Sequence, residues 1–334
     1  MSLTIDPTVA KPDFYTNALG AKAALDYYGV AVIPNLLSPE EIEDFRQGMW
    51  DTLEQLTSTT ETPVNRNDTT TWHGYKQIAS LHSMLIQHFG IGHANVVWQL
   101  RQNPKVVTVF QQLFGLTNPE DLLVSFDGMA IHLPHELVNP NAGYFRKTWY
   151  HCDQSYRRNE DECYQSWVTA YDVNEGDATL STLLYSHHFH QEFAQTFSMN
   201  NRDEGNKEFY VLQEAEQQWY INKGCVPYNL VVPAGSMVLW NSKTIHCGKE
   251  PDKVRPQWNI RTVVYICMTP RAKATEANLK KKQDCFTNGR MTTHNPHRVR
   301  MFSKTPRTYG AKLPTTAALP PPTMSPLGFK LAGF

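Results

Sequence analysis

Residues 149–153, with the sequence WYHCD, carry two side chains that can bind a metal ion. In an extended segment successive side chains alternate between faces, so His151 and Asp153 point the same way while Cys152 points the other. An imidazole and a carboxylate then converge on one point. The pair is weak evidence by itself, because His-x-Asp also occurs by chance and a single histidine is more often structural.

A second histidine, His246, follows about ninety residues later, and two histidines with one carboxylate form the facial triad of non-haem Fe(II) oxygenases. Such a triad leaves three coordination positions open. Downstream, Arg261 opens the apolar run of residues 262–268. The planar fork of a buried arginine pairs with both oxygens of a carboxylate, which suits the far carboxylate of 2-oxoglutarate. The spacing therefore indicates an iron site formed by His151, Asp153 and His246, with an arginine for the cosubstrate.

Arg255 is the alternative to Arg261 for this role. It lies within residues 251–256 (PDKVRP), a composition typical of solvated loops, whereas Arg261 immediately precedes an apolar strand and is expected to point inward. We therefore predict that Arg261 binds the cosubstrate and keep Arg255 as the second candidate.

The elements that position these residues are mostly helical in the first third of the chain. Ser38 predicts a helix start, since it can cap, Pro39 suits the first helical position and Glu41 completes a capping box. Further helices are expected at residues 20–28, 75–90 and 104–115, a short strand at residues 29–34 and a Thr- and Asn-rich loop at residues 57–71.

From about residue 122 the pattern changes to short β-rich runs separated by turns. These runs are LLVSFDGMAIHL, YQSWVTAYDV, TLSTLLY, YNLVVP, SMVLWNS and RTVVYICM. Many short strands in succession predict a sandwich or barrel rather than a parallel sheet with crossover helices.

The chain is expected to form one catalytic domain in three parts. Residues 1–120 form a helical region that packs on the core, residues 121–270 form the β core, and residues 271–334 form a basic, Pro-rich extension. That extension carries 12 Lys/Arg and 2 Asp/Glu, and we expect it to wrap the surface or to be partly disordered. Its charge suits a phosphate-bearing ligand, nucleic acid or the acidic body of the same chain, and we favour the last.

The composition is that of a globular protein, with 41% hydrophobic and 19% charged residues. No apolar run is long enough for a membrane span, and the start of the chain lacks a secretory signal, so we expect a cytoplasmic protein. Six cysteines without a C-x-x-C pair are expected to be free thiols.

Taken in order, these motifs resemble the phytanoyl-CoA dioxygenase (PhyH-like) family of Fe(II)/2-oxoglutarate oxygenases. The resemblance rests on YGVAVIP at residues 28–34, LLSPEE at 36–41, the His151-x-Asp153 pair, LLYSH at 183–187, the hydrophobic strand before His246, and Arg261. It implies a double-stranded β-helix, a cupin-like jelly roll, flanked by N-terminal helices. It also implies that His151, Asp153 and His246 bind iron and that Arg261 anchors 2-oxoglutarate.

The resemblance extends to the strand expected around Trp167, where it places an aromatic residue near the cosubstrate. Gln165 and Thr169 share its face, so Gln165 and Trp167 are candidate cosubstrate-binding residues, with an ordinary core position as the alternative for Trp167. Asp153 is also informative, because related halogenating enzymes replace this carboxylate by a small residue. Its presence favours hydroxylation.

The remaining histidine pairs receive other interpretations. The resemblance places His187, His188 and His190 at a turn and helix start, as surface or capping groups. His294 and His297 lie in the basic extension, where solvated side chains are the default and a lid over the site is the alternative.

The activity implied is a hydroxylase that acts on a small molecule or an amino-acid side chain. It would consume O2 and 2-oxoglutarate, release succinate and CO2, and be supported by ascorbate. The alternatives are a non-catalytic binding protein on the same fold and a nucleic-acid-associated protein acting through residues 271–334, which we disfavour because no recognisable module is present. Candidate pocket or entrance residues are Trp72, Tyr75, His132, Asn139, Arg157 and Arg158.

Overall fold

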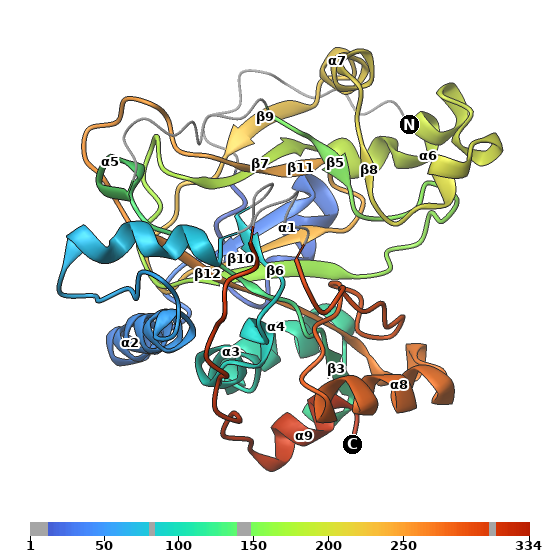
Figure 1. The fold of residues 1–334 in the computed structure, drawn as a ribbon. Coiled ribbons are helices and arrows are strands. Elements are labelled where there is room, and N and C mark those ends of the chain that lie inside the picture. Colours follow the sequence, from blue (N-terminus) through green and yellow to red (C-terminus); the bar gives the residue numbers. More distant parts are fainter. Residues whose placement is uncertain (1–12, 80–83, 139–147, 307–311) are drawn as a thin grey trace.

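A computed structural model describes residues 13–79, 84–138, 148–306 and 312–334, and two antiparallel sheets form its centre (Figure 1). The large sheet has the order β1 (Val30–Ile33), β10 (Met237–Asn241), β6 (Tyr164–Thr169), β12 (Arg261–Pro270), β4 (Met129–His132) and β2 (Leu85–Ile86), with β3 (Leu122–Val124) also paired to β12. The small sheet has the order β8 (Tyr210–Val211), β5 (His151–Cys152), β11 (His246–Lys249), β7 (Thr179–Leu184) and β9 (Val226–Asn229). The predicted jelly-roll class is confirmed, although the sheets do not close into a barrel.

Helices cover the outer faces of both sheets (Figure 1). Below the large sheet lie α2 (Pro39–Thr57), α3 (Asn95–Arg101), α4 (Pro104–Phe114), α8 (Glu276–Thr287) and α9 (Pro326–Ala332). Beyond the small sheet lie α6 (His190–Thr196) and α7 (Glu214–Asn222), while α1 (Ala21–Tyr28) precedes β1 and α5 (His135–Val138) follows β4. The 3-10 helices are η1 (Thr69–Gln77), η2 (Ile91–His93), η3 (Pro119–Asp121), η4 (Ser186–Phe189), η5 (Met199–Asn201), η6 (Asp203–Asn206) and η7 (Arg271–Lys273).

The start of α2 confirms the predicted capping box. The Ser38 hydroxyl accepts a hydrogen bond from the Glu41 amide at 3.2 Å, and the Glu41 carboxylate accepts one from the Ser38 amide at 2.7 Å. The same carboxylate also accepts from Asn103 and Lys105 at the start of α4. The capping group of one helix therefore fixes the neighbouring helix as well.

The prediction of a helix at residues 75–90 is wrong for the described residues of that range. Residues 75–77 end η1, and Leu85–Ile86 form β2, which pairs with β4. Gly74 allows η1 to approach the chain closely, since a Cβ there would lie 2.1 Å from the Thr62 carbonyl oxygen. Contacts with remote segments, which local periodicity does not encode, decide this region.

The basic extension packs against the large sheet through α8 and α9, so its described residues are ordered elements of the fold. Lys282 on α8 is 1% exposed. Its ammonium donates to the Val124 carbonyl and lies 3.8 Å from the Phe126 ring centroid. Arg298 pairs with Glu162 at 2.8 Å and Arg300 with Glu208 at 3.5 Å. Part of the excess positive charge thus meets acidic side chains of the same chain.

Two apolar clusters hold these layers together. The larger cluster lies between the large sheet and its helices, and the smaller one, which includes Cys152, Cys247 and Phe193, lies between the small sheet and α6 and α7. All six cysteines are buried and free, as predicted. Within the described ranges, no helix is long and apolar enough to cross a membrane.

Candidate metal and cosubstrate site

Strand pairing brings the two predicted histidine ligands together. His151 on β5 and His246 on β11 are direct partners across the small sheet, with ring centroids 4.3 Å apart. Asp153 follows β5, and its carboxylate oxygens lie 3.7 Å from His151 Nε2 and 3.4 Å from His246 Nε2. One ligand atom from each residue lies within 4.8 Å of the other two. The structure therefore gathers the three side chains that the sequence singled out.

Backbone carbonyls orient both imidazoles. His246 Nδ1 lies 2.8 Å from the Thr244 carbonyl, and His151 Nδ1 lies 3.3 Å from the Trp149 carbonyl. A ring nitrogen that donates to a carbonyl leaves the opposite nitrogen with a free lone pair, which fixes the tautomer. The Trp149 ring stacks on the His151 ring at 4.5 Å. Both Nε2 atoms are thus presented to the Asp153 carboxylate.

Burial and mutual charge set the protonation states of the triad. Burial, with a contribution from His246, lowers the pKa of His151 to about 3. Burial alone would raise the pKa of Asp153, but His151 and the neighbouring histidines outweigh it and lower that pKa well below its usual value. A neutral imidazole and an ionised carboxylate are the forms that bind a metal ion. Two imidazole nitrogens and one carboxylate oxygen on a buried site are a donor set that fits Fe(II).

Gln165 lies beside the triad, where it orients the carboxylate. Its side-chain amide donates to Asp153 Oδ2 at 3.0 Å from β6, and it lines the same cavity. Hydrogen bonds of this kind hold metal ligands in place and tune their affinity. Gln165 therefore contacts a ligand residue of the metal site. Its role as a cosubstrate-binding residue stays a prediction.

Arg261, the first residue of β12, lies in the same cavity with part of its guanidinium unpaired. The residue is 3% exposed, and its Nε and Nη1 atoms have no hydrogen-bond partner among the described residues. Its guanidinium carbon lies 5.7 Å from the ring centroid of Trp167, which is fully buried. A buried cation without a partner is costly, so this position favours an anionic ligand.

Arg255 has a different environment. Its side chain is also 3% exposed, which corrects the expectation of a solvated loop residue, and it pairs with Glu136 and with Asp177 at 2.7 Å each. Asp177 is itself buried, so the arginine is drawn inward by charge rather than by apolar neighbours. Both prongs of its guanidinium are occupied by carboxylates of the chain.

A cavity of about 900 Å³ contains the triad, Gln165 and Arg261. Five aromatic side chains line it: Trp149, Phe209, Trp240, Tyr265 and Phe302. A second group of lining residues comes from the basic extension, namely Thr293, His294, Asn295, Arg298 and Arg300. The space is mainly apolar, with charged side chains contributed by several loops.

Most of the candidate entrance residues lie elsewhere. Trp72 packs against Trp50 with ring centroids 5.1 Å apart, and the Tyr75 hydroxyl donates to the Ile131 carbonyl, so both belong to the core around η1. His132 is the strand partner of Arg261 but does not line the cavity. Asn139 lies outside the described residues.

The two arginines after the triad differ from each other. Arg157 is exposed and donates to the Arg202 carbonyl. Arg158 pairs with Glu162 at 2.6 Å and with Glu208. Neither arginine lines the cavity.

The histidines of η4 and α6 are only partly as expected. His188 is exposed, which fits a surface group. His187 and His190 are 6% and 2% exposed, so the surface interpretation is wrong for them. His187 lies 3.1 Å from the Asp26 carbonyl, and His190 stacks on Tyr156 at 4.6 Å. His187 thus contacts the last turn of α1, which agrees with the capping interpretation, and neither histidine lines the cavity.

The histidines of the basic extension are not solvated, which corrects the default expectation. His297 is 5% exposed and lies 3.1 Å from the Thr269 hydroxyl. His294 lines the cavity with the triad. Burial opposes its charged form, but a hydrogen bond with Cys163 and the carboxylates of Asp153 and Asp127 outweigh burial and raise the pKa of His294 to about 10. Only the His-x-x-His spacing drew attention to this residue in the sequence.

Comparisons with known proteins show the family to which the chain belongs. Residues 25–251, more than half of the chain, match the model of the family described as phytanoyl-CoA dioxygenase (PhyH). Ava biosynthesis cluster protein O of Aspergillus versicolor is 28% identical over 276 residues, covering 81% of this chain and 83% of that protein.

Two solved structures show the same fold at low sequence identity. A hypothetical protein from Escherichia coli superposes with a TM-score of 0.59 at 14% identity, covering 96% of this chain and 85% of that one. A putative oxidoreductase from Salmonella typhimurium LT2 superposes with a TM-score of 0.54 at 14% identity, covering 94% and 82%. Given the family match and the His-Asp-His triad, the chain belongs to the phytanoyl-CoA dioxygenase (PhyH) family of enzymes that depend on Fe(II) and 2-oxoglutarate.

Proposed function

We propose that the protein is an oxygenase that hydroxylates a small organic molecule at the expense of 2-oxoglutarate. In the balanced reaction, a C–H bond of the substrate, O2 and 2-oxoglutarate give an alcohol, succinate and CO2. When bound, iron and 2-oxoglutarate supply the chemistry that activates O2. His151, Asp153 and His246 would hold the iron through two Nε2 atoms and one carboxylate oxygen.

The observation that carries this proposal is the unpaired guanidinium of Arg261 beside the triad. Its Nε and Nη1 atoms are buried without a partner, and it lies in the cavity that contains the metal ligands. The N–H groups of a guanidinium donate strong, charge-assisted hydrogen bonds to a carboxylate. In our proposal the Arg261 guanidinium binds the far carboxylate of 2-oxoglutarate, and the Trp167 ring packs against that guanidinium.

Two features support hydroxylation of a small molecule. Asp153 supplies a carboxylate to the triad and accepts a hydrogen bond from Gln165. A halide would need the position that this carboxylate fills. The relative from Aspergillus versicolor is named as a biosynthesis cluster protein, and a role in biosynthesis suits a small-molecule substrate in our proposal. An amino-acid side chain is the second substrate class that the sequence allows.

The proposal is tested by titrating the Fe(II)-loaded protein with 2-oxoglutarate in the absence of oxygen. A keto acid chelated to ferrous iron gives a visible charge-transfer absorption, which we expect for the wild type. His151→Ala should abolish the absorption. Arg261→Met should require at least tenfold more 2-oxoglutarate, because the loss of a charge-assisted pair removes about 1.5–3 kcal/mol.

Arg157→Met is the matched control, since Arg157 is an exposed arginine outside the cavity. It should titrate like the wild type. On admission of O2 with ascorbate, succinate should form in the wild type and not in His151→Ala. An iron-loaded wild type without the absorption would overturn the cosubstrate assignment, and cosubstrate binding without any succinate would support a non-catalytic binding protein.

A further inference from the structure

The wall of the cavity formed by residues 291–302 has no assigned role. The triad and Arg261 account for the metal and the cosubstrate, yet a cavity of about 900 Å³ is much larger than one small dicarboxylate. The remaining space is bounded by aromatic side chains and by this segment. A substrate seated near the metal would therefore contact it.

The segment is a hairpin fixed to the body of the protein along its length. Thr292 and Met301 form an isolated antiparallel bridge, and the Thr293 amide donates to the Arg300 carbonyl at 2.9 Å. At its base, Thr292 exchanges hydrogen bonds with Phe126, at 3.0 Å and 3.1 Å. These contacts place the hairpin beside the loop between β3 and β4.

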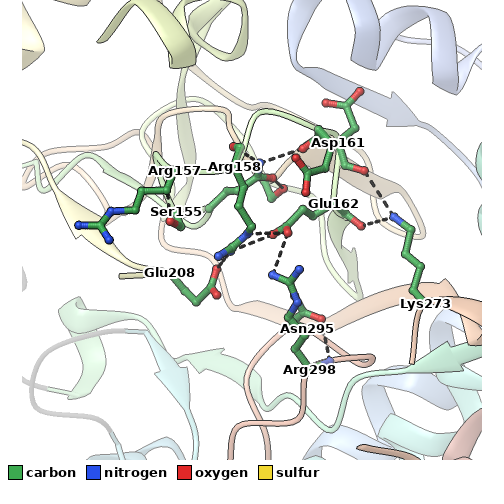
Figure 2. Close-up of polar contacts among 12 residues, drawn as sticks. Ser155, Arg157, Arg158, Asp161, Glu162, Glu208, Lys273, Asn295 and Arg298 are labelled. Carbon is green, nitrogen blue, oxygen red and sulfur yellow. Dashed lines mark hydrogen bonds and ion pairs between the residues drawn. The ribbon is translucent and has the colours of Figure 1, made fainter. Parts of the chain in front are cut away.

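The tip of the hairpin is held by a network of ion pairs (Figure 2). Arg298 pairs with Glu162 at 2.8 Å, and its amide donates to the Asn295 side chain at 3.1 Å. Arg158 forms ion pairs with both Glu162 and Glu208. Glu208 lies in a second segment that lines the cavity. The hairpin is thus anchored at its base and its tip, and its side chains are presented to the cavity as a fixed wall.

His294 differs from the charged residues of the same wall. The guanidinium groups of Arg298 and Arg300 already face carboxylates, whereas His294 makes no ion pair within 4.0 Å among the described residues. Cys163 is a neighbour of the ring. A neutral imidazole donates through one ring nitrogen, and a protonated imidazole donates through both. In either state His294 can offer a donor to the cavity.

We infer that His294 is a substrate-positioning residue, which donates a hydrogen bond to an acceptor group on a mainly apolar, ring-bearing small molecule held by the aromatic walls. This inference rests on the proposed function and narrows its substrate class. An amino-acid substrate would need partners for both a carboxylate and an ammonium group, and the guanidinium groups of this wall are already paired with acidic side chains. A carbonyl or hydroxyl group on an apolar frame matches the lining better.

The test uses Prodan, a neutral naphthalene with a ketone, and 2-(dimethylamino)naphthalene, which lacks the ketone. Protein loaded with Fe(II) and 2-oxoglutarate is titrated with each dye without oxygen, and binding is followed by fluorescence. The wild type should bind Prodan more tightly than the analogue. His294→Leu should weaken Prodan binding by about five- to tenfold, the range of one hydrogen bond, and leave the analogue unchanged.

Two further variants separate positioning from structural damage. His294→Gln keeps a side-chain donor and should retain the preference for the ketone, and His188→Ala, an exposed histidine outside the cavity, should behave as the wild type. Equal binding of both dyes by the wild type, or an unchanged preference in His294→Leu, would overturn the inference.

The charge-transfer absorption is recorded in the same samples. If it forms in the wild type and in His294→Leu while the dye result is negative, the inference fails and the proposed function stands. If it is absent from the wild type, the proposed function fails by itself.

Discussion

At the scale of single residues, Arg255 and Arg261 show how two arginines with enclosed side chains can have opposite surroundings. Each side chain is almost fully enclosed, but Arg255 faces the carboxylates of Glu136 and Asp177, while the Nε and Nη1 atoms of Arg261 face no acceptor among the described residues. A paired arginine stabilises the fold, because removing it leaves the buried carboxylate of Asp177 and the half-buried one of Glu136 uncompensated. An unpaired one is a cost that a ligand can offset.

This contrast predicts that the two arginines separate stability from cosubstrate binding. Arg255→Met should lower the free energy of unfolding by about 3 kcal/mol, because Glu136 and Asp177 lose their common cation. Arg261→Met should change it little and should lose 2-oxoglutarate affinity. Urea unfolding and the anaerobic titration measure the two effects. If Arg255→Met instead kept its stability and lost the charge-transfer absorption, Arg255 would be the cosubstrate anchor.

The convergence of His151 and Asp153 was predictable from the sequence, since side chains alternate along a strand and these two therefore lie on one side. The surroundings of Arg255 were not, because its partners Glu136 and Asp177 are remote in the sequence and its loop composition suggests solvent. For the same reason His294 was expected to be solvated, with a position over the site only as the alternative. Its position depends on the hairpin's attachment to Phe126 and Glu162, and no local pattern encodes those contacts.

At the scale of elements, the prediction was most complete for α2, because neighbouring side chains determine where this helix starts. The capping box formed by Ser38 and Glu41 is present, and the Glu41 carboxylate also reaches Asn103 and Lys105 at α4. Helix α3 was not predicted, and residues 84–90 contain a strand instead of a helix. Local capping chemistry is readable from a sequence, whereas pairing with a distant strand is not.

Removing the cap should therefore destabilise the protein in a measurable way. Ser38→Ala should lower the free energy of unfolding by about 1 kcal/mol, because the Glu41 amide loses its acceptor. Ser58→Ala, at the exposed opposite end of the same helix, should change it by less than about 0.5 kcal/mol. Urea unfolding of both variants tests this, and equal effects at the two ends would contradict a specific role for the cap.

At the scale of the whole molecule, buried histidines link stability to pH. Burial lowers the pKa of His93 to about 4 and the pKa values of His132, His187 and His190 to about 3. In the unfolded chain these groups titrate near about 6.5, so below that pH the unfolded state binds protons that the folded state does not. Stability therefore falls as the pH falls, by up to about 1.4 kcal/mol per histidine and pH unit.

We predict that the urea midpoint of the metal-free protein is lower at pH 5.5 than at pH 7.5. Asp127 and His294 oppose this trend, because their pKa values are raised to about 6 and about 10 and their protonated forms gain stability in acid, but they are two groups against four. His190→Phe should reduce the dependence on pH, because the stacking on Tyr156 is kept and one titrating group is removed. His188→Ala should leave the dependence unchanged. A midpoint that rises on acidification would contradict the assignment.

The order of strands in the large sheet also has a consequence for biosynthesis. Among the described residues β12 is the last strand in sequence, yet it lies in the middle of that sheet, between β6 and β4. Until β12 has been translated, β6 and β4 have no neighbour on that side, and their open edges invite pairing with other nascent chains. The sheet can therefore close only after β12 has left the ribosome, about ninety residues after β6, and chaperone capture during synthesis should matter for the yield.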